Sequence, residues 1–343
     1  MRPDQWQAFK RAAKREPGAG MPLALIVDSP WIPGYLKIGH LDYYFDPEVW
    51  FQANLRIAQE FPEAILLPSW WVEFGMAIEP SAFGNRIHFH PDRTPDQTPS
   101  LTRLDDVERL APVNPWTDGL MPAALHRYRS MKRRIRDAGF TIPMVAARGP
   151  LCLASFLRGL TELMTDLVDR PELVHRLLDL TTQTVIEWLT AQAEAIGDGF
   201  EGILVLDDIV GFLSPRAYRE FGQPYLRRVA DAFPPECVKV YHNDANVRPF
   251  LAELPGAGFD VLNWSHQIGI QQAQQKLAGR MCLMGNVPPL ETAVRGTPEE
   301  VRQSARDIIA ASDGSPLILS VGGGVSPGTP RENLRALIEA AGS

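Results

Sequence analysis

The sequence predicts an α/β fold, and within that class a (β/α)8 TIM barrel. Short runs of β-branched or aliphatic residues recur along the chain, and helical patterns separate them, which is typical of parallel strands covered by helices. There are eight such runs, the number of strands that closes a barrel, and a length of 343 residues suits this fold with some insertions. An open doubly wound sheet is the alternative with less support.

The eight runs are spread over the whole chain. They are PLALIV (22–27), EAILLP (63–68), IPMVAA (142–147), GILVLDD (202–208), VKVYHND (238–244), DVLNWS (260–265), MCLMGN (281–286) and PLILSVG (316–322). Helical patterns occupy segments 47–61, 170–196, 214–233, 297–312 and 329–341. Several of these begin with Ser or Thr followed by Pro, which favours a helix start, and Thr297 with Glu300 forms a capping box.

Composition and charge indicate a single globular domain over residues 1–343. With 45% hydrophobic and 22% charged residues, the chain can bury a sizeable core. A long polar, Pro-rich stretch near residues 86–115 is expected to be an insertion over one end of the barrel. A net charge of −7 and a pI near 5.6 argue against nucleic acid or an anionic membrane as the main partner.

The N-terminal segment bears on the location of the protein. Residues MRPDQWQAFKRAAKREPG have the pattern of a polar amphipathic helix rather than of a signal peptide. The sequence contains no run of about 18 uncharged apolar residues that could span a membrane. Cys152, Cys237 and Cys282 are too few for a disulfide framework and form no C-x-x-C pair. We therefore expect a cytoplasmic protein with buried thiols.

Polar side chains follow the predicted strands, where a barrel of this kind builds its active site. Strand alternation places His242 and Asp244 on the same side of the fifth predicted strand, so both side chains should point into one space. The other candidates at these positions are Asp28 and Ser29, Trp70, Trp71 and Glu73, Arg148, Asp207 and Asp208, Asn263, Ser265 and His266, Asn286, and Gly322–Gly324.

Three of these candidates allow more than one role. Glu73 stands beside aromatic residues, and a desolvated carboxyl group suits a general acid. Arg148 could bind a substrate anion or neutralise Asp207 and Asp208, and the second role is favoured because adjacent acids in a barrel mouth need a counter-charge. Asn263 ends the sixth predicted strand, where a ligand contact and a loop-surface role are both open.

Aromatic residues are dense in the first two predicted loops. Such walls, together with a few carboxylates, suit an aromatic ring or a methylated ammonium group. Packing of the barrel mouth is the alternative for about half of them. The aromatic residues are Trp31, Tyr35, Tyr43, Tyr44, Phe45, Trp70, Trp71 and Phe74. The predicted substrate-binding set is Asp28, Trp31, Tyr35, Trp70, Trp71, Arg148 and Asn263.

Four stretches in the C-terminal two-thirds resemble the uroporphyrinogen decarboxylase superfamily. They are RGPLCLASFLRGLTELMTDLVDRPELVHRLLDLTT, GILVLDDIVGFLSPRAYREFGQPYLRRV, MGNVPPLETAVRGTPEEV and GGGVSPGTPRENLRALIEA. The N-terminal third is similar through DPEVWFQANLRIAQEF and VEFG. This superfamily includes the porphyrinogen decarboxylases and the zinc methyltransferases that serve corrinoid proteins and coenzyme M. The resemblance implies the same barrel.

The resemblance is closer to the methyltransferase branch. The decarboxylases carry an arginine-rich motif after the first strand, whereas this chain has DSPWIPGYLKIGHLDYYFD, without arginine. The methyltransferases bind zinc through His-x-Cys after the fifth strand and a Cys after the eighth, positions that correspond to His242, Asp244 and Gly323. Because both thiolates are absent, carboxylates would have to complete a site for zinc or another divalent metal. A hydrogen-bonded pair without metal is the alternative.

These features together predict an enzyme and its reaction. The resemblance implies a methyltransferase that moves a methyl group from a small O- or N-methylated compound, an aromatic ether or a quaternary amine, to a corrinoid carried on a separate protein. A decarboxylase or lyase, or a non-catalytic ligand-binding barrel, is the alternative. No membrane or nucleic acid partner is expected, and a homodimer is compatible with the sequence. The expected catalytic residues are Glu73, His242 and Asp244, and the expected metal ligands are His242, Asp244 and Asp207.

Overall fold

A computed structural model describes residues 1–342, and its principal strands form a parallel barrel. One sheet has six strands in the order β10-β9-β8-β7-β6-β5, and a second pairs β1 with β2. Bridges from Leu23 to Leu319 and from Ile26 to Gly324 join β1 to β10. Among residues 1–342 no strand pairing joins β2 to β5. The barrel strands are β1 (Ala24–Ile26), β2 (Ile65–Leu67), β5 (Met144–Arg148), β6 (Gly202–Leu206), β7 (Val238–Asn243), β8 (Val261–Trp264), β9 (Cys282–Val287) and β10 (Leu317–Val321). The predicted (β/α)8 barrel is confirmed.

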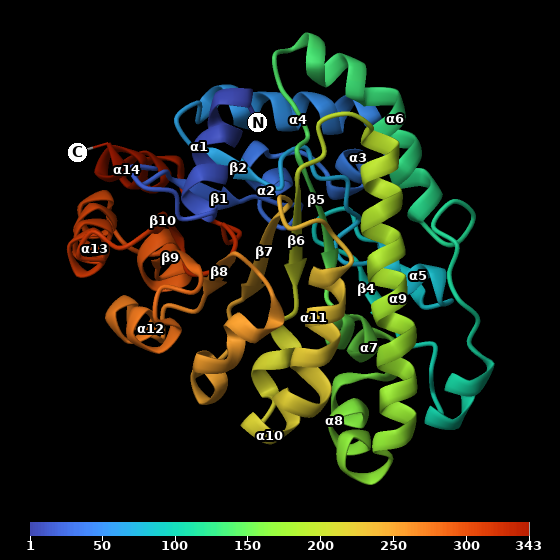
Figure 1. Ribbon diagram of the computed structural model, residues 1–343. Helices are drawn as coiled ribbons and strands as arrows, with labels where there is room; N and C mark the ends of the chain where they lie inside the picture. The colour runs from blue at the N-terminus through green and yellow to red at the C-terminus, as the bar shows by residue number, and fades with distance from the viewer. Residues whose placement is uncertain (343) are drawn as a thin grey trace.

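Helices surround the strands, with α9 along one side and α12 to α14 on the other (Figure 1). The helices are α1 (Pro3–Ala13), α2 (Ile32–Leu36), α3 (His40–Phe45), α4 (Pro47–Glu60), α5 (Ile78–Ala82), α6 (Met121–Asp137), α7 (Pro150–Arg158), α8 (Leu160–Asp169), α9 (Pro171–Ile196), α10 (Pro215–Ala217), α11 (Gln223–Asp231), α12 (Ile270–Leu277), α13 (Pro298–Ala311) and α14 (Arg331–Ala341). Short 3-10 or π segments are η1 (Leu104–Arg109), η2 (Asp208–Phe212), η3 (Tyr218–Gly222), η4 (Arg248–Ala257) and η5 (Pro289–Val294).

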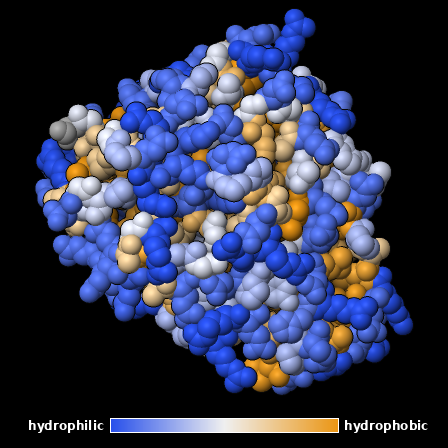
Figure 2. Space-filling view, in the orientation of Figure 1, coloured by the Kyte–Doolittle hydropathy of each residue, from blue (hydrophilic) through white to orange (hydrophobic). Residues whose placement is uncertain are grey.

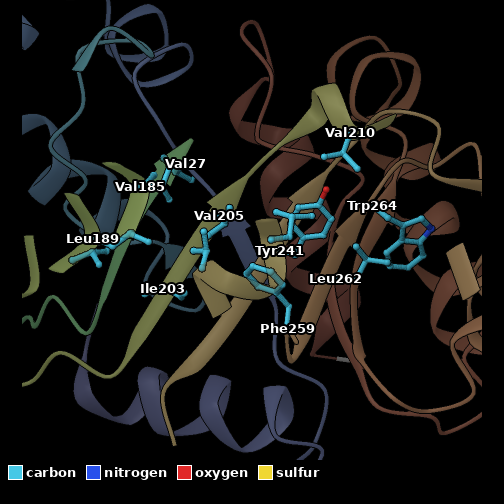
Figure 3. Packing of buried hydrophobic residues seen from close by; sticks show 14 of the residues in the cluster. Val27, Val185, Leu189, Ile203, Val205, Val210, Tyr241, Phe259, Leu262 and Trp264 are labelled. Carbon is cyan, nitrogen blue, oxygen red and sulfur yellow. The ribbon is translucent and has the colours of Figure 1, made fainter. Parts of the chain in front are cut away.

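Alternation along the strands divides the core into two clusters. In β6, Leu204 and Leu206 point into the barrel, while Ile203 and Val205 point out toward the helices. Figure 3 shows this outer layer, in which strand residues such as Val205 and Tyr241 lie in one packed cluster with residues of α9. Because side chains alternate with a period of two, a polar residue at a strand end is directed by the same parity.

Helix α1 closes the barrel at the end opposite the strand tips. Trp6 and Phe9 are buried in the inner cluster with residues such as Met144 and Val238. In Figure 1, α1 lies across the upper end of the strands, and α8 and α10 lie at the lower end. The predicted amphipathic helix therefore buries its apolar face in the barrel.

The polar insertion contains a two-stranded antiparallel hairpin, β3 (Arg86–His88) and β4 (Asp96–Thr98), followed by η1. Asn85 anchors the hairpin, because its Nδ2 donates to the carbonyl of Phe156 at 2.8 Å. Phe89 extends from the hairpin and contacts the ring of Phe45, with ring centroids 4.9 Å apart. The insertion thus packs against the loops that follow β1 and β2.

The outer surface is largely hydrophilic in the view of Figure 2, with hydrophobic patches toward the lower edge. Helix α8 contributes the exposed Val168 and Leu160. Within residues 1–342, no helix combines the length and the apolar character that a membrane crossing requires.

Candidate active site

Three side chains meet at the carboxyl ends of β6 and β7. His242 points inward from β7, Asp208 follows β6, and Asp244 follows β7. One ligand atom from each lies within 4.8 Å of the other two, and we call this group the carboxylate–histidine cluster. His242 is buried, Asp208 is partly buried and Asp244 is exposed, so the cluster opens toward solvent on one side.

Asn263 determines which nitrogen of His242 is free to bind a ligand. Its Nδ2 donates to the carbonyls of Met284 at 2.8 Å and Val321 at 3.1 Å, which fixes its Oδ1 as the acceptor facing His242. His242 Nδ1 lies 2.7 Å from that oxygen and must donate to it. In neutral His242 the Nε2 lone pair is therefore available, 3.5 Å from Asp208 Oδ1.

The carboxylates of the cluster repel each other. Partial desolvation of its carboxyl group, although the residue as a whole is exposed, and the neighbouring Asp208 raise the pKa of Asp244, and His242 opposes that shift. The Asp244 backbone N–H donates to Asp208 Oδ1 at 3.1 Å, which keeps the two acids together. A Cβ placed on Gly323 would lie 3.1 Å from Asp244 Oδ2, so the three positions matched to the family's zinc ligands do meet here. One nitrogen and two carboxylates fit a divalent cation with N and O preference.

Asp207 does not belong to this cluster, contrary to the predicted metal set. Its carboxylate accepts hydrogen bonds from the backbone N–H of Leu151 at 3.0 Å and of Cys152 at 2.8 Å, and so caps α7. Gly149 leaves room for it, because a Cβ there would lie 2.3 Å from Asp207 Oδ2. Burial raises the pKa of Asp207 to about 8. Asp207 shares the outward parity of Val205, so strand alternation was the signal that could have selected Asp208 instead.

A second polar group lies at the ends of β1, β2 and β5. Glu73 Oε1 accepts the Ser29 N–H at 2.6 Å, and its Oε2 lies 3.6 Å from Arg148 Nη2. The Arg148 guanidinium lies over the Trp71 ring, 5.4 Å from its centroid. Burial and the nearby Glu73 raise the pKa of Asp28 well above its usual range. Arg148 thus pairs with Glu73, and the predicted pairing with Asp207 and Asp208 is not observed.

The strand register relates the two groups to each other. Arg148 pairs with Leu206, Leu206 with His242, and His242 with Asn263, so all four lie in one row across the sheet. Neighbouring strands are about 4.8 Å apart, which places the Cα atoms of Arg148 and His242 roughly 10 Å from each other along the row. Both side chains point into the barrel, so they face the same mouth.

Most of the predicted aromatic wall is core instead. Trp31 stacks on Tyr35 with centroids 4.4 Å apart, and Tyr35 donates to Glu60 Oε1 at 2.6 Å. Trp70 stacks on Phe51, 5.2 Å away. Trp31 and Trp70 are buried in the outer cluster, and Tyr35 packs against it, so these three are not available to a ligand in the mouth. Trp71 belongs to the inner cluster and lies at the site.

Glu79 is a site neighbour that sequence reasoning missed. Its Oε1 accepts the Arg148 backbone N–H at 2.9 Å, and burial raises its pKa. With Trp71, Glu73, Arg148 and other residues it lines a cavity of about 10 Å³, enough for about one water molecule. Glu79 lies in α5, which follows no predicted strand directly, so nothing in the sequence marked it as a site residue.

Solved structures with the same fold include a methyltransferase and a methionine synthase. A methyltransferase from Methanosarcina mazei has a TM-score of 0.83 and 23% identity, over 98% of this chain and 97% of that chain. A B12-independent methionine synthase from Shewanella has a TM-score of 0.61 and 14% identity, over 94% of this chain and 97% of that chain. At these identities the likeness concerns the fold.

Curated relatives carry a different name. Uroporphyrinogen decarboxylase of Thermus thermophilus is 31% identical over 242 residues, 68% of this chain and 67% of the relative. Uroporphyrinogen decarboxylase of Coxiella burnetii is 25% identical over 353 aligned positions, 97% of this chain and 93% of the relative. The family model described as uroporphyrinogen decarboxylase (URO-D) matches residues 34–343. The barrel and this match together show that the chain belongs to the uroporphyrinogen decarboxylase family.

Proposed function

We propose that this chain is a methyltransferase that moves a methyl group from a small O- or N-methylated compound to a corrinoid on a separate protein. The observation that carries the proposal is the carboxylate–histidine cluster at the position of the zinc ligands in the resembled methyltransferases. The loop after β1, residues 28–46, contains no arginine to bind the many carboxylates of a porphyrinogen. The fold shared with a named methyltransferase is compatible with this reading.

A divalent metal fits the cluster. His242 Nε2, Asp208 and Asp244 would hold it, and the cation would offset the repulsion between the two carboxylates. When bound, such an ion acts as a Lewis acid on the heteroatom that carries the methyl group. Asn263 serves the cluster by holding the His242 ring in one tautomer and one orientation.

The proton balance depends on the methyl donor. An ether oxygen that loses its methyl group gains a proton to become an alcohol or a phenol, whereas a quaternary ammonium group leaves as a neutral tertiary amine and needs no proton. Solvent can supply the proton, because the cluster is open to solvent on the side of Asp244. Asp28 lies beside Glu73 and Arg148, where burial and Glu73 raise its pKa and favour its protonated form. Glu73 is held by the Ser29 N–H, and Tyr44 donates to Ser29 Oγ at 3.0 Å, so this acid pair has a fixed support.

The partner would dock over the mouth of the barrel. Phe45, Phe212 and Leu290 are exposed, with 52%, 62% and 47% of their surface accessible. Each lies in a segment that follows a barrel strand: α3 after β1, η2 after β6 and η5 after β9. Exposed apolar side chains around an active-site mouth are typical of a protein-binding surface.

Decarboxylation is the second candidate, favoured by the names of the curated relatives. Two measurements on the purified chain separate the candidates. Metal content and methyl transfer to reduced free cobalamin, from a methoxylated aromatic or a quaternary ammonium compound, should both be positive and should both be lost in His242→Ala. His266→Ala, a neighbouring loop histidine 3.8 Å from Glu291, is the matched control. Selective thermal stabilisation by a porphyrinogen, with no methyl transfer, would support the decarboxylase instead.

A further inference from the structure

Arg148 is a nearly buried arginine whose hydrogen-bond donors are unused. Its residue is 7% exposed, yet within residues 1–342 its guanidinium donates no hydrogen bond to the protein. None of its side-chain nitrogens is among the fully buried polar atoms that lack a partner, so they retain contact with accessible space. Arg148 ends β5 with the inward parity of Met144 and Ala146. Part of that accessible space is the cavity of about 10 Å³ that Arg148 lines with Trp71, Glu73 and Glu79, and the inward direction of the side chain places the guanidinium on the side of the barrel mouth.

The ion pair with Glu73 does not account for this arginine. Charge-assisted pairs between arginine and carboxylate are usually bidentate, with N–O distances of about 2.7–2.9 Å. Here the shortest distance is 3.6 Å, and Glu73 Oε2 is itself buried without a hydrogen bond. Leaving such groups unsatisfied is costly, and functional sites are where proteins tolerate that cost. The Trp71 face supports the guanidinium on one side and leaves its edge free for a planar acceptor.

The charges around Arg148 permit one additional anion. Asp28 and Glu79 both have raised pKa values because of burial, which favours their neutral forms. Glu73 and Arg148 then balance each other, and an incoming carboxylate gains hydrogen bonds from the free N–H groups. A polyanion would meet Glu73, Asp208 and Asp244 without further cations, so a single carboxylate is the best match.

The spacing limits the size of the ligand. The Cα atoms of Arg148 and His242 are roughly 10 Å apart along the sheet, and both side chains reach inward. The Arg148 side chain turns toward Glu73, which follows β2 on the side of β5 away from β7, so a ligand that reaches from the guanidinium to the carboxylate–histidine cluster must bridge a distance of this order. One aromatic ring, or a chain of a few atoms, spans it.

We propose that the methyl donor is a compact monocarboxylate whose carboxylate binds the Arg148 guanidinium while its methylated heteroatom faces the carboxylate–histidine cluster. A methoxybenzoate has this arrangement. The inference rests on the proposed function for the chemistry at the methyl group, but carboxylate binding can be measured independently of any reaction. It also revises the sequence-based expectation of a neutral or cationic ligand.

Calorimetric titration with 4-methoxybenzoate and with methoxybenzene tests the proposal. The unmodified chain should bind the carboxylate at least about tenfold more tightly than the neutral ether. Arg148→Lys keeps the charge beside Glu73 but loses the planar fork, and should weaken carboxylate binding about tenfold with little effect on methoxybenzene. Arg129→Gln removes the charge of an exposed arginine stacked on Trp116, and should change neither affinity.

A second variant covers the case in which Arg148→Lys misfolds. The pair Glu73→Gln with Arg148→Gln leaves no unpaired buried charge, and it should bind both ligands with similar affinity. Equal affinity of the unmodified chain for the two ligands, binding of neither, or an unchanged preference in the Arg148 variants would overturn the proposal. Carboxylate binding that depends on Arg148, without methyl transfer to cobalamin, would uphold it and overturn the proposed function instead.

Discussion

The hydrogen bond between His242 and Asn263 decides how the carboxylate–histidine cluster can work. Without it, neutral His242 could place its proton on Nε2, and the nitrogen that faces the cluster would then carry no lone pair for a ligand. The amide of Asn263 is immobilised by two backbone carbonyls, so the ring is held before any ligand arrives. Because the His242 ring is already ordered in the folded chain, binding of a ligand costs little further conformational entropy.

The two adjacent acids after β6 should have separable effects. Asp208→Asn should lower zinc affinity markedly, because it removes a charged ligand from the cluster. Asp207→Asn should leave zinc affinity unchanged and destabilise the fold by about 1–2 kcal/mol, because it weakens the cap of α7. Zinc titration with a competing chelator and urea denaturation measure the two effects. Loss of zinc affinity in Asp207→Asn would mean that Asp207 is a metal ligand, as the sequence predicted.

Asp28 should make stability depend on pH. Its pKa is raised in the folded chain, mainly by burial and Glu73 and in opposition to Arg148, above an unfolded value of about 3.9. The protonated form is therefore the stabilising one. Its contribution is complete below pH about 4 and is lost as pH rises through the folded pKa, at up to about 1.4 kcal/mol per pH unit. Asp28→Asn stays neutral, so its stability relative to the unmodified chain should rise in urea denaturation as pH increases above about 4. A difference that is constant with pH would contradict this.

Sequence reasoning found the strand tips but not the direction of every side chain. His242, Asp244, Glu73 and Arg148 were selected because polar residues at the ends of apolar strands require an explanation. The parity of the strands, already visible in the sequence, would also have directed Asp207 outward. For Trp31 and Trp70 no parity rule was available, since both lie in loops whose path depends on contacts with α4 and other helices.

At the scale of elements, α1 closes the end of the barrel opposite the mouth. Trp6 and Phe9 fill the barrel interior at this end. Lys14 pairs with Asp260 at 2.8 Å and so holds the end of the helix against the barrel. Each predicted apolar run covers its strand to within one residue, because such runs are buried on both faces in a parallel sheet; β5 and β9 extend one residue further, to Arg148 and Val287. The predicted helix at 214–233 is instead divided by the π segment η3, near Pro224, which cannot donate a backbone hydrogen bond.

Trp6→Ala should therefore be strongly destabilising. Trp6 is 2% exposed, and removal of its ring leaves a cavity inside the barrel at the α1 end, which the rigid sheet cannot close. Truncations of this type cost about 3–5 kcal/mol. Val168→Ala on α8, at a residue that is 80% exposed, should cost less than about 0.5 kcal/mol. Both values follow from urea denaturation. A small effect of Trp6→Ala would mean that α1 merely lies against the barrel.

At the scale of the whole molecule, the Glu73–Arg148 part of the candidate site lies at the interruption in the barrel. No strand pairing joins β2 to β5 within residues 1–342, and Glu73 and Arg148 face each other across that interval. The backbone N–H of Arg148 turns to Glu79 of α5 instead of to β2. A carboxylate ligand on the free N–H groups of Arg148 would add contacts where the sheet itself provides none. The interruption could not be predicted from the sequence, because the apolar runs carry no information on which neighbours pair.

The exposed apolar side chains around the mouth allow docking of a corrinoid protein to be tested separately from metal binding and methyl transfer in the active site. Phe212→Asp places a charge on η2, four residues beyond Asp208, without removing a buried side chain. It should leave metal content and 4-methoxybenzoate affinity unchanged, because no ligand of the cluster is altered.

If a corrinoid protein docks on this surface, methyl transfer to it should fall at least about tenfold, since charges are disfavoured in the core of a protein interface. Transfer to free cobalamin should persist. Gln7→Asp on α1, exposed at the opposite end of the barrel, is the matched control for an added surface charge. Equal loss with both acceptors would place the defect in the active site, and no loss with either would show that the partner binds elsewhere.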